Sequence, residues 1–143
     1  MPSGRYVHSA SAAAVVDRVW EQLQQAETWA GIGPIDSVWD AALDGEGLAS
    51  FRWAAIAAGR SWEGSARTVR AVPGELMELA LSSPEIQGLI TCALAAANAT
   101  SCTVTITLEA EASGLLASLF WGTVDAAIRN SFAGHVQAFA KSV

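Results

Sequence analysis

The sequence predicts an α+β fold in which helices at both ends of the chain cover an antiparallel sheet. Three observations lead to this prediction. The chain begins with a short strand and an amphipathic helix, continues with about six strands joined by short turns, and ends with a proline-free segment at residues 113–143. Consecutive strands with short connections pair as an antiparallel meander. The apolar face of such a sheet must be covered, and the terminal helices are available to cover it.

The N-terminal segment predicts a strand followed by two short helices. Residues 5–12 have the pattern of a short strand, and a helix is expected from about Ala14 to Gln25. That helix places apolar side chains on one face at 3.6-residue spacing. These are Val16, Val19, Trp20 and Leu23. A second helical turn, AETW, follows and ends at the Gly/Pro cluster of residues 31–34, because glycine and proline interrupt helices.

Turn residues divide the middle of the chain into six predicted strands. The expected ranges are 34–43, 48–56, 61–72, 76–82, 86–97 and 101–111. The first two flank DGEG, whose glycines permit the positive φ angles of a hairpin turn. The last strand alternates most clearly, with Cys102, Val104, Ile106 and Leu108 on one face and threonines on the other. Such alternation indicates one buried and one solvated face.

The C-terminal segment predicts one long helix over residues 115–143. On a helical wheel its larger apolar side chains form one broad arc. The arc contains Phe120, Trp121, Val124, Ile128, Phe132, His135, Val136 and Phe139. Gly122 and Gly134 lie inside this helix, where each costs about 1 kcal/mol relative to alanine. We expect this cost to reflect either close packing on the sheet or a bend between the two halves of the helix.

Composition limits the classes of partner. The 143 residues are expected to form a single domain over 1–143, with 52% hydrophobic residues, a net charge of −6 and Lys141 as the only lysine. This charge disfavours nucleic acid and anionic membrane surfaces as partners. The longest uncharged run alternates in polarity, so no membrane span is expected. The oligomeric state, monomer or homodimer, stays open.

Cellular location and cysteine chemistry follow from weaker signals. The N-terminus lacks a basic stretch followed by an apolar core, so a cytoplasmic protein is expected. Cys92 and Cys102 have no metal-site spacing, and we interpret them as reduced thiols in the core. A cross-strand disulfide between them is the less favoured alternative.

Two stretches carry a resemblance to a known superfamily. They are VVDRVWEQLQQAETWAGI, with Val19-Trp20 and Trp29 followed by Gly31-Ile32, and the tail that opens with SGLL at residues 113–116. With the order of elements, they resemble the START-like helix-grip (SRPBCC) superfamily, and in particular its small bacterial polyketide cyclase/dehydrase and lipid-transport proteins. The resemblance implies a curved antiparallel sheet of about seven strands wrapped around the C-terminal helix, with a cavity between them.

The resemblance also implies three candidate functions. Binding of an apolar small molecule, such as a lipid or a polyketide, is the favoured one. The alternatives are a polyketide cyclase/dehydrase-type enzyme and a protein-interaction module of the toxin or co-chaperone kind. The enzyme would need two or more polar groups that converge inside the cavity.

Large apolar residues on strands and on the last helix are the candidate ligand-binding residues, because aromatic rings bury much area and stack on planar ligands. They are Trp39, Phe51, Trp53, Trp62, Met77, Phe120, Val124 and Ile128. Any of them can instead simply fill the core. The strand positions depend on register, since a shift of one residue turns every side chain to the other face.

No catalytic residue, metal site or cofactor is predicted. His135 has a suitable side chain for acid–base chemistry, but no carboxylate or serine lies at a spacing that would orient it, so a hydrogen-bonded core histidine is favoured. His8 receives no role. The histidines and cysteines are scattered without ligand spacing. The strand arginines, which are Arg52, Arg67 and Arg70, are expected on the outer face of the sheet.

Overall fold

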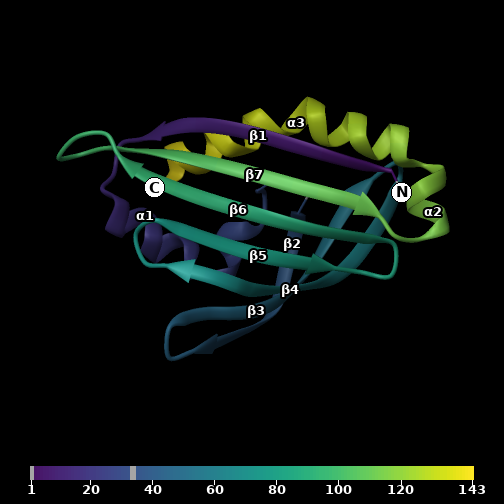
Figure 1. Cartoon of the computed structure of the whole chain (residues 1–143), viewed down its shortest axis with the longest axis horizontal. Coiled ribbons are helices and arrows are strands. Elements are labelled where there is room, and N and C mark those ends of the chain that lie inside the picture. Colours follow the sequence, from purple (N-terminus) through teal and green to yellow (C-terminus); the bar gives the residue numbers. More distant parts are fainter. Residues whose placement is uncertain (1, 33–34) are drawn as a thin grey trace.

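A single antiparallel sheet of seven strands forms the body of the protein (Figure 1). The computed structural model describes residues 2–32 and 35–143. The strands are β1 (Ser3–Ala12), β2 (Ile35–Asp44), β3 (Gly47–Ala57), β4 (Arg60–Val72), β5 (Leu76–Ser82), β6 (Ile86–Ala96) and β7 (Cys102–Ala112). Their order across the sheet is β1-β7-β6-β5-β4-β3-β2, so β2 to β7 form the predicted meander and β1 pairs with β7. The α+β fold and the strand number are confirmed.

Two short helical segments follow β1, as predicted. They are α1 (Val16–Leu23) and the 3₁₀ helix η1 (Ala26–Trp29). The indole N–H of Trp29 donates to the carbonyl oxygen of Leu23 at 3.0 Å, so the fully buried Trp29 joins the two segments. Gly33 and Pro34, part of the Gly/Pro cluster expected after η1, lie outside the described residues.

The predicted long C-terminal helix is confirmed, but its expected range of residues 115–143 is divided into a short helix and a long one. They are α2 (Leu115–Leu119) and α3 (Trp121–Ser142), which meet at Phe120 with φ −98° and ψ 11°. The start of α2 is attached to the turn between β5 and β6. The side chain of Glu85 accepts hydrogen bonds from the backbone N–H groups of Leu116 at 2.7 Å and Ala117 at 3.2 Å, which satisfies the free donors at the start of α2. This attachment holds the first turn of α2 against the β5–β6 turn.

The two helix glycines do not have the roles expected of them. A Cβ atom added to Gly122 or Gly134 would meet no atom within 4 Å. Neither residue therefore allows a close approach to the sheet. The interruption of the helix lies at Phe120 and not at either glycine.

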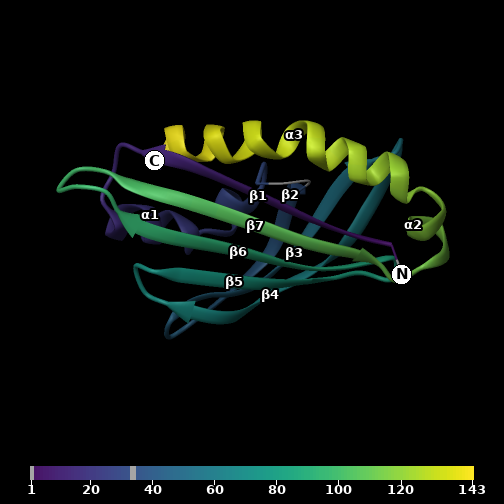
Figure 2. The same ribbon diagram turned by 45° about the horizontal axis from the view of Figure 1, so that its top comes forward.

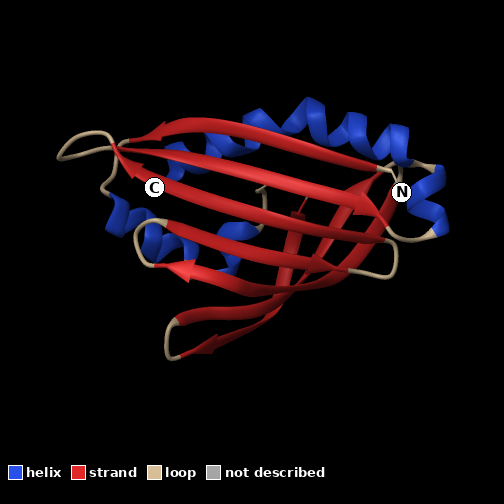
Figure 3. Ribbon diagram, in the orientation of Figure 1, coloured by secondary structure: helices blue, strands red, loops and turns tan. Residues whose placement is uncertain are grey.

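Helix α3 runs beside β1 (Figure 1), and the strands curve beneath it so that the far ends of β3 and β4 rise toward the α2–α3 junction (Figure 2). Three contacts fix α3 to β1. The Tyr6 hydroxyl donates to Oδ1 of Asp125 at 2.6 Å, the rings of Tyr6 and Phe132 lie 6.2 Å apart, and Gln137 is hydrogen-bonded to His8 at 3.2 Å. Figure 3 shows the helices gathered on one side of the curved sheet.

The inner faces of the strands and α3 enclose the core. The alternation predicted for β7 is confirmed, since Cys102, Val104, Ile106 and Leu108 are all buried. Cys92 and Cys102 are free and buried, as predicted. Burial, reinforced by the charge that Cys102 would carry, raises the pKa of the Cys92 thiol to about 12. Cys92 is therefore protonated and unreactive near neutral pH.

The outer face of the sheet carries the polar side chains. Arg52, Arg67 and Arg70 are exposed there, as predicted, and Arg70 lies 3.6 Å from Glu78. Within residues 2–32 and 35–143, no helix is both long and apolar enough to cross a membrane.

Candidate functional site

An apolar cavity of about 40 Å³ lies between the inner face of the sheet and the first half of α3. Every described side chain around it is apolar, or is the hydrogen of a glycine. Its lining consists of Ile35, Trp53, Ala55, Ala57, Trp62, Leu81, Ile86, Gly88, Leu108, Ala110, Trp121, Val124 and Ile128. This volume is close to that of one water molecule in the liquid, and apolar cavities of this kind stay dry.

Small residues in register with large ones create the cavity. Trp53 on β3 is paired with Gly64 on β4, and Trp62 on β4 is paired with Ala55 on β3. On the far wall, Gly88 of β6 is the register partner of both Leu81 and Ala110, so two small residues lie side by side on β6 and β7. The indole of Trp53 occupies the space beside Gly64, whereas Ala55, Gly88 and Ala110 themselves line the cavity.

The indole groups of the strand tryptophans are fixed by backbone hydrogen bonds. The N–H of Trp53 donates to the carbonyl oxygen of Ser65 at 2.9 Å, and the N–H of Trp62 donates to that of Ala57 at 2.9 Å. Both donors are therefore already used, and both rings present only their apolar surface to the cavity. Gly64 is needed for this arrangement, because a Cβ atom there would lie 2.6 Å from Cζ2 of Trp53.

Four of the eight predicted ligand-binding residues come together around this cavity. They are Trp53, Trp62, Val124 and Ile128. Their role in binding stays a prediction. The sequence pattern did not single out Trp121, which also lines the cavity, or the small residues of its walls. Trp121 lies on the predicted apolar arc of the last helix, and this position was the sequence feature that could have identified it as a lining residue.

The other four predicted residues lie elsewhere. Trp39 is 37% exposed on the edge strand β2, where register shifts on either side of it disturb the pairing with β3. Phe51 is buried in the core without lining the cavity. Met77 is buried against the end of α1, where the side-chain amide of Gln24 donates to its Sδ at 3.4 Å.

Phe120 lies at the α2–α3 junction beside the cavity and is half-buried. The guanidinium carbon of Arg60, the first residue of β4, lies 5.0 Å from the centroid of its ring. This cation–π contact joins the β3–β4 turn to the junction of the helices. Trp121, the next residue, lines the cavity, so the contact between Arg60 and Phe120 lies at the end of the cavity next to Trp121. Three exposed leucines of α2, Leu115, Leu116 and Leu119, surround the same junction.

A polar cluster fixes α3 near the cavity. Asp125 accepts hydrogen bonds from the hydroxyl of Tyr6 and from Nε of Arg129, the latter at 3.0 Å. The bond from Tyr6 and the charge of Arg129 lower the pKa of Asp125, although partial burial opposes this. Burial and the bond to Asp125 raise the pKa of Tyr6 well above its usual value. Asp125 is therefore ionised and Tyr6 neutral near pH 7.

The predicted role of His135 as a hydrogen-bonded core residue is wrong. The side chain is half-buried, and its Nδ1 atom is buried with no hydrogen-bond partner among the described residues. An unpaired buried polar atom costs about 1–3 kcal/mol. The wheel placed His135 on the apolar arc correctly, but none of the side chains that line the groove beside it, among them Asp36, Ile56 and Ala57, forms a hydrogen bond with its Nδ1 atom.

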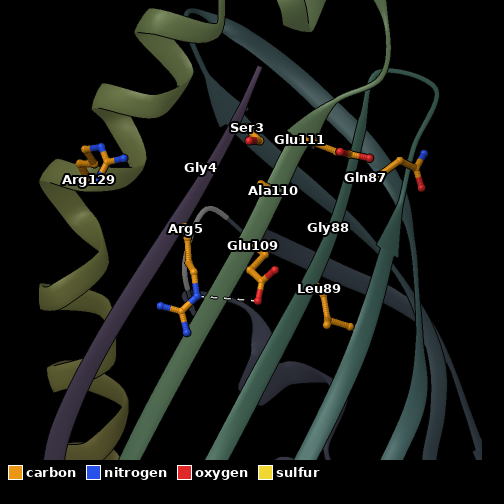
Figure 4. Close-up of a pocket in the computed structure, with 10 residues that line it drawn as sticks. All are labelled: Ser3, Gly4, Arg5, Gln87, Gly88, Leu89, Glu109, Ala110, Glu111 and Arg129. Atoms are coloured by element: carbon orange, nitrogen blue, oxygen red, sulfur yellow. Dashed lines mark ion pairs between the residues drawn. The ribbon is translucent and has the colours of Figure 1, made fainter. Parts of the chain in front are cut away.

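A larger concavity lies on the outer face of the sheet and is lined by polar and charged as well as apolar residues. It has a volume of about 710 Å³, and Figure 4 shows its residues spread over β1, β6 and β7, with Arg129 across β1 on α3. Arg5 and Glu109 form an ion pair there at 3.8 Å, with side chains 66% and 57% exposed. Exposed pairs of this kind contribute little to stability. No enclosed site is formed, so the apolar cavity is the better candidate.

The described part of the chain contains no group of three or more His, Cys, Asp or Glu side chains arranged to hold a metal ion. The cavity lining also offers no ligand for one, since its described side chains are apolar.

Comparisons with known proteins bear on the fold. No family model matches the sequence, and no curated protein matches it. Among solved structures, the Zhui aromatase/cyclase from Streptomyces sp. R1128 superposes with a TM-score of 0.72 and 16% identity, over 97% of this chain and 94% of that one. A START superfamily protein from Mycobacterium smegmatis superposes with a TM-score of 0.65 and 14% identity, over 92% of this chain and 96% of that one. Norcoclaurine synthase from Thalictrum flavum superposes with a TM-score of 0.59 and 11% identity, over 94% of this chain and 84% of that one.

These identities are too low to carry a function, but the superpositions extend over nearly the whole chain. The superposed length of this chain contains its antiparallel sheet, the two short helical segments after β1 and the long helix α3. The chain therefore has the START-like helix-grip fold.

Proposed function

We propose that the protein binds an apolar small molecule in the cavity between its sheet and α3, and that it does so in the cytoplasm. One observation carries the proposal: the walls present three tryptophan side chains and no polar group among the described residues. Two of those indoles have their N–H groups bonded to backbone carbonyls. Such a surface gains free energy from apolar contact and offers a ligand no hydrogen bond.

The ligand must widen the cavity, because about 40 Å³ does not hold a molecule larger than a water or a methyl group. Apart from the edge strand β2, the strands of the wall are paired on both sides, so widening depends on the first part of α3 and requires the hydrogen bond between Tyr6 and Asp125 to lengthen or break. Its attachment to α2 is interrupted at Phe120, and its side chains Trp121, Val124 and Ile128 face the cavity. Movement of this segment away from the sheet provides the volume.

The cyclase/dehydrase alternative is less well supported. It requires polar groups that converge on the substrate, and the described lining residues supply none. The neighbour named as an aromatase/cyclase has 16% identity to this chain, which supports the fold and not the activity. No observation in the structure favours a protein-interaction module over the binding proposal.

Native mass spectrometry of the purified protein, followed by organic extraction, tests the proposal. A discrete added mass that extracts as an apolar compound is the expected result. In parallel, naphthalene is titrated and binding is measured by calorimetry and by the fluorescence of the cavity tryptophans. The matched control is Ala110→Leu, which fills the cavity from β7. A protein that carries no ligand and does not bind naphthalene at micromolar concentrations would contradict the proposal.

A further inference from the structure

The apolar cavity borders a small polar groove, and the two share a wall. The groove has a volume of about 120 Å³ and opens at the surface between β2, β3 and the middle of α3. Its lining consists of Asp36, Ile56, Ala57, Ala127, Ile128, Ser131 and His135. Ala57 and Ile128 also line the cavity, so these two side chains border both spaces.

The polar atoms of the groove have specific unused capacity. Nδ1 of His135 is buried and lacks a partner among the described residues. Ser131 donates its hydroxyl hydrogen to the carbonyl oxygen of Ala127 at 2.8 Å, which leaves its oxygen free to accept. Asp36 accepts from the backbone N–H of Ile56 through one carboxylate oxygen, and the other remains available. Acceptors therefore predominate beside the imidazole.

Negative charge on both sides of His135 selects against an anion. Asp36 lies in the groove, and on the other side His135 borders a second concavity that includes Glu27 and Gln22. A ligand carboxylate or phosphate would be repelled by the negative charges of Asp36 and Glu27. A neutral hydroxyl can donate to an acceptor oxygen or to an unprotonated imidazole nitrogen, and can also accept from an imidazole N–H.

We infer that the ligand carries a neutral hydroxyl group, which lies against His135 while the apolar part of the ligand occupies the cavity. This inference rests on the proposed function. Widening the cavity at Ala57 and Ile128 connects it to the groove, and the hydroxyl then pairs with the Nδ1 atom that the protein leaves unpaired. His135 is thus a specificity residue at the polar end of an otherwise apolar site.

Calorimetric titrations with naphthalene, 2-naphthol and 2-naphthoate test the inference. For the wild-type protein, we expect 2-naphthol to bind more tightly than naphthalene, and 2-naphthoate to bind most weakly. In His135→Phe, the ratio of the naphthalene Kd to the 2-naphthol Kd should fall about fivefold to tenfold, with naphthalene affinity unchanged. His135→Gln, which restores a donor and an acceptor, should recover part of the ratio. Asn130→Ala, at an exposed position of α3 that lines neither the cavity nor the groove, is the matched control and should keep the wild-type ratio.

The outcomes separate the two proposals. If naphthalene binds but His135→Phe and His135→Gln both keep the wild-type ratio, the role of His135 is wrong while the apolar site stands. Tightest binding of 2-naphthoate would also overturn the inference, since it would mean that the groove accepts an anion. If neither naphthalene nor 2-naphthol binds, the proposed function itself fails, and the inference fails with it.

Discussion

A methyl group at Gly64 is expected to disrupt one wall of the cavity. In Gly64→Ala, the new Cβ would lie 2.6 Å from Cζ2 and 2.9 Å from Cε2 of Trp53, and it would also overlap the backbone oxygen of Ser82. Real Cβ atoms do not approach other atoms so closely. The indole cannot simply move aside, because its N–H is held by the carbonyl oxygen of Ser65 at 2.9 Å.

The magnitude follows from two costs. Overpacking of a core costs about 1–3 kcal/mol, and loss of the indole hydrogen bond about 1 kcal/mol. We therefore expect Gly64→Ala to lower the free energy of unfolding by about 2–4 kcal/mol. The unfolding entropy of a chain of 143 residues is about 0.3 kcal/mol/K at the midpoint, so Tm should fall by about 7–13 °C.

Thermal unfolding followed by circular dichroism and by tryptophan fluorescence measures this effect. Gly134→Ala provides the matched comparison, because its Cβ would meet no atom within 4 Å in a helix interior. That variant should gain about 1 kcal/mol, which raises Tm by about 3 °C. A Gly64→Ala protein that unfolds within a degree of the wild type would refute the packing of Trp53 against β4.

Three further results are expected. Because Tyr6 and Arg129 lower the pKa of Asp125, its ionised form stabilises the fold above the unfolded pKa near 3.9. That contribution is lost as the pH falls through the lower folded pKa of Asp125. The Tm difference between wild type and Asp125→Asn should therefore shrink from pH 7 to pH 3. A difference that stays constant over this range would contradict the stabilising role of the Asp125 carboxylate. Ala110→Leu should abolish naphthalene binding in calorimetry while the protein stays folded; unchanged affinity would place the ligand outside this cavity. Cys92 and Cys102 should not react with a thiol reagent in the native protein at pH 8 but should react in denaturant, and rapid native reaction would show that the sheet opens there.

Much of the fold could be predicted from local patterns. The strands alternate because one face is buried, and the turns are marked by glycine, proline and aspartate, so β5 was predicted over its full range 76–82. The break at Phe120 could not be predicted in this way. The separate start of α2 is bonded to Glu85, which lies about thirty residues earlier in the chain, and a contact of such sequence separation leaves no local pattern.

The candidate site was predictable in part for the same reason. Trp53 and Trp62 lie on regularly paired strands, where alternation fixes the face of each side chain. Trp39 lies on an edge strand next to Asp40, which has a φ of 52°, and the register shifts before Ala42. A register shift interrupts the period-2 alternation of side chains, so the exposed position of Trp39 could not be predicted from the sequence.

The pairing of the first strand with the last has a consequence for synthesis on the ribosome. Hydrogen bonds join β1 to β7, and Tyr6 is bonded to Asp125, 119 residues further along the chain. While the chain is being made, β1 therefore has neither a neighbouring strand nor a covering helix until the C-terminal third has emerged. The meander of β2 to β6 can form earlier, but the edge at β6 stays open for that whole period. Closure of the molecule is thus a late event, and contacts of such long sequence separation slow it further.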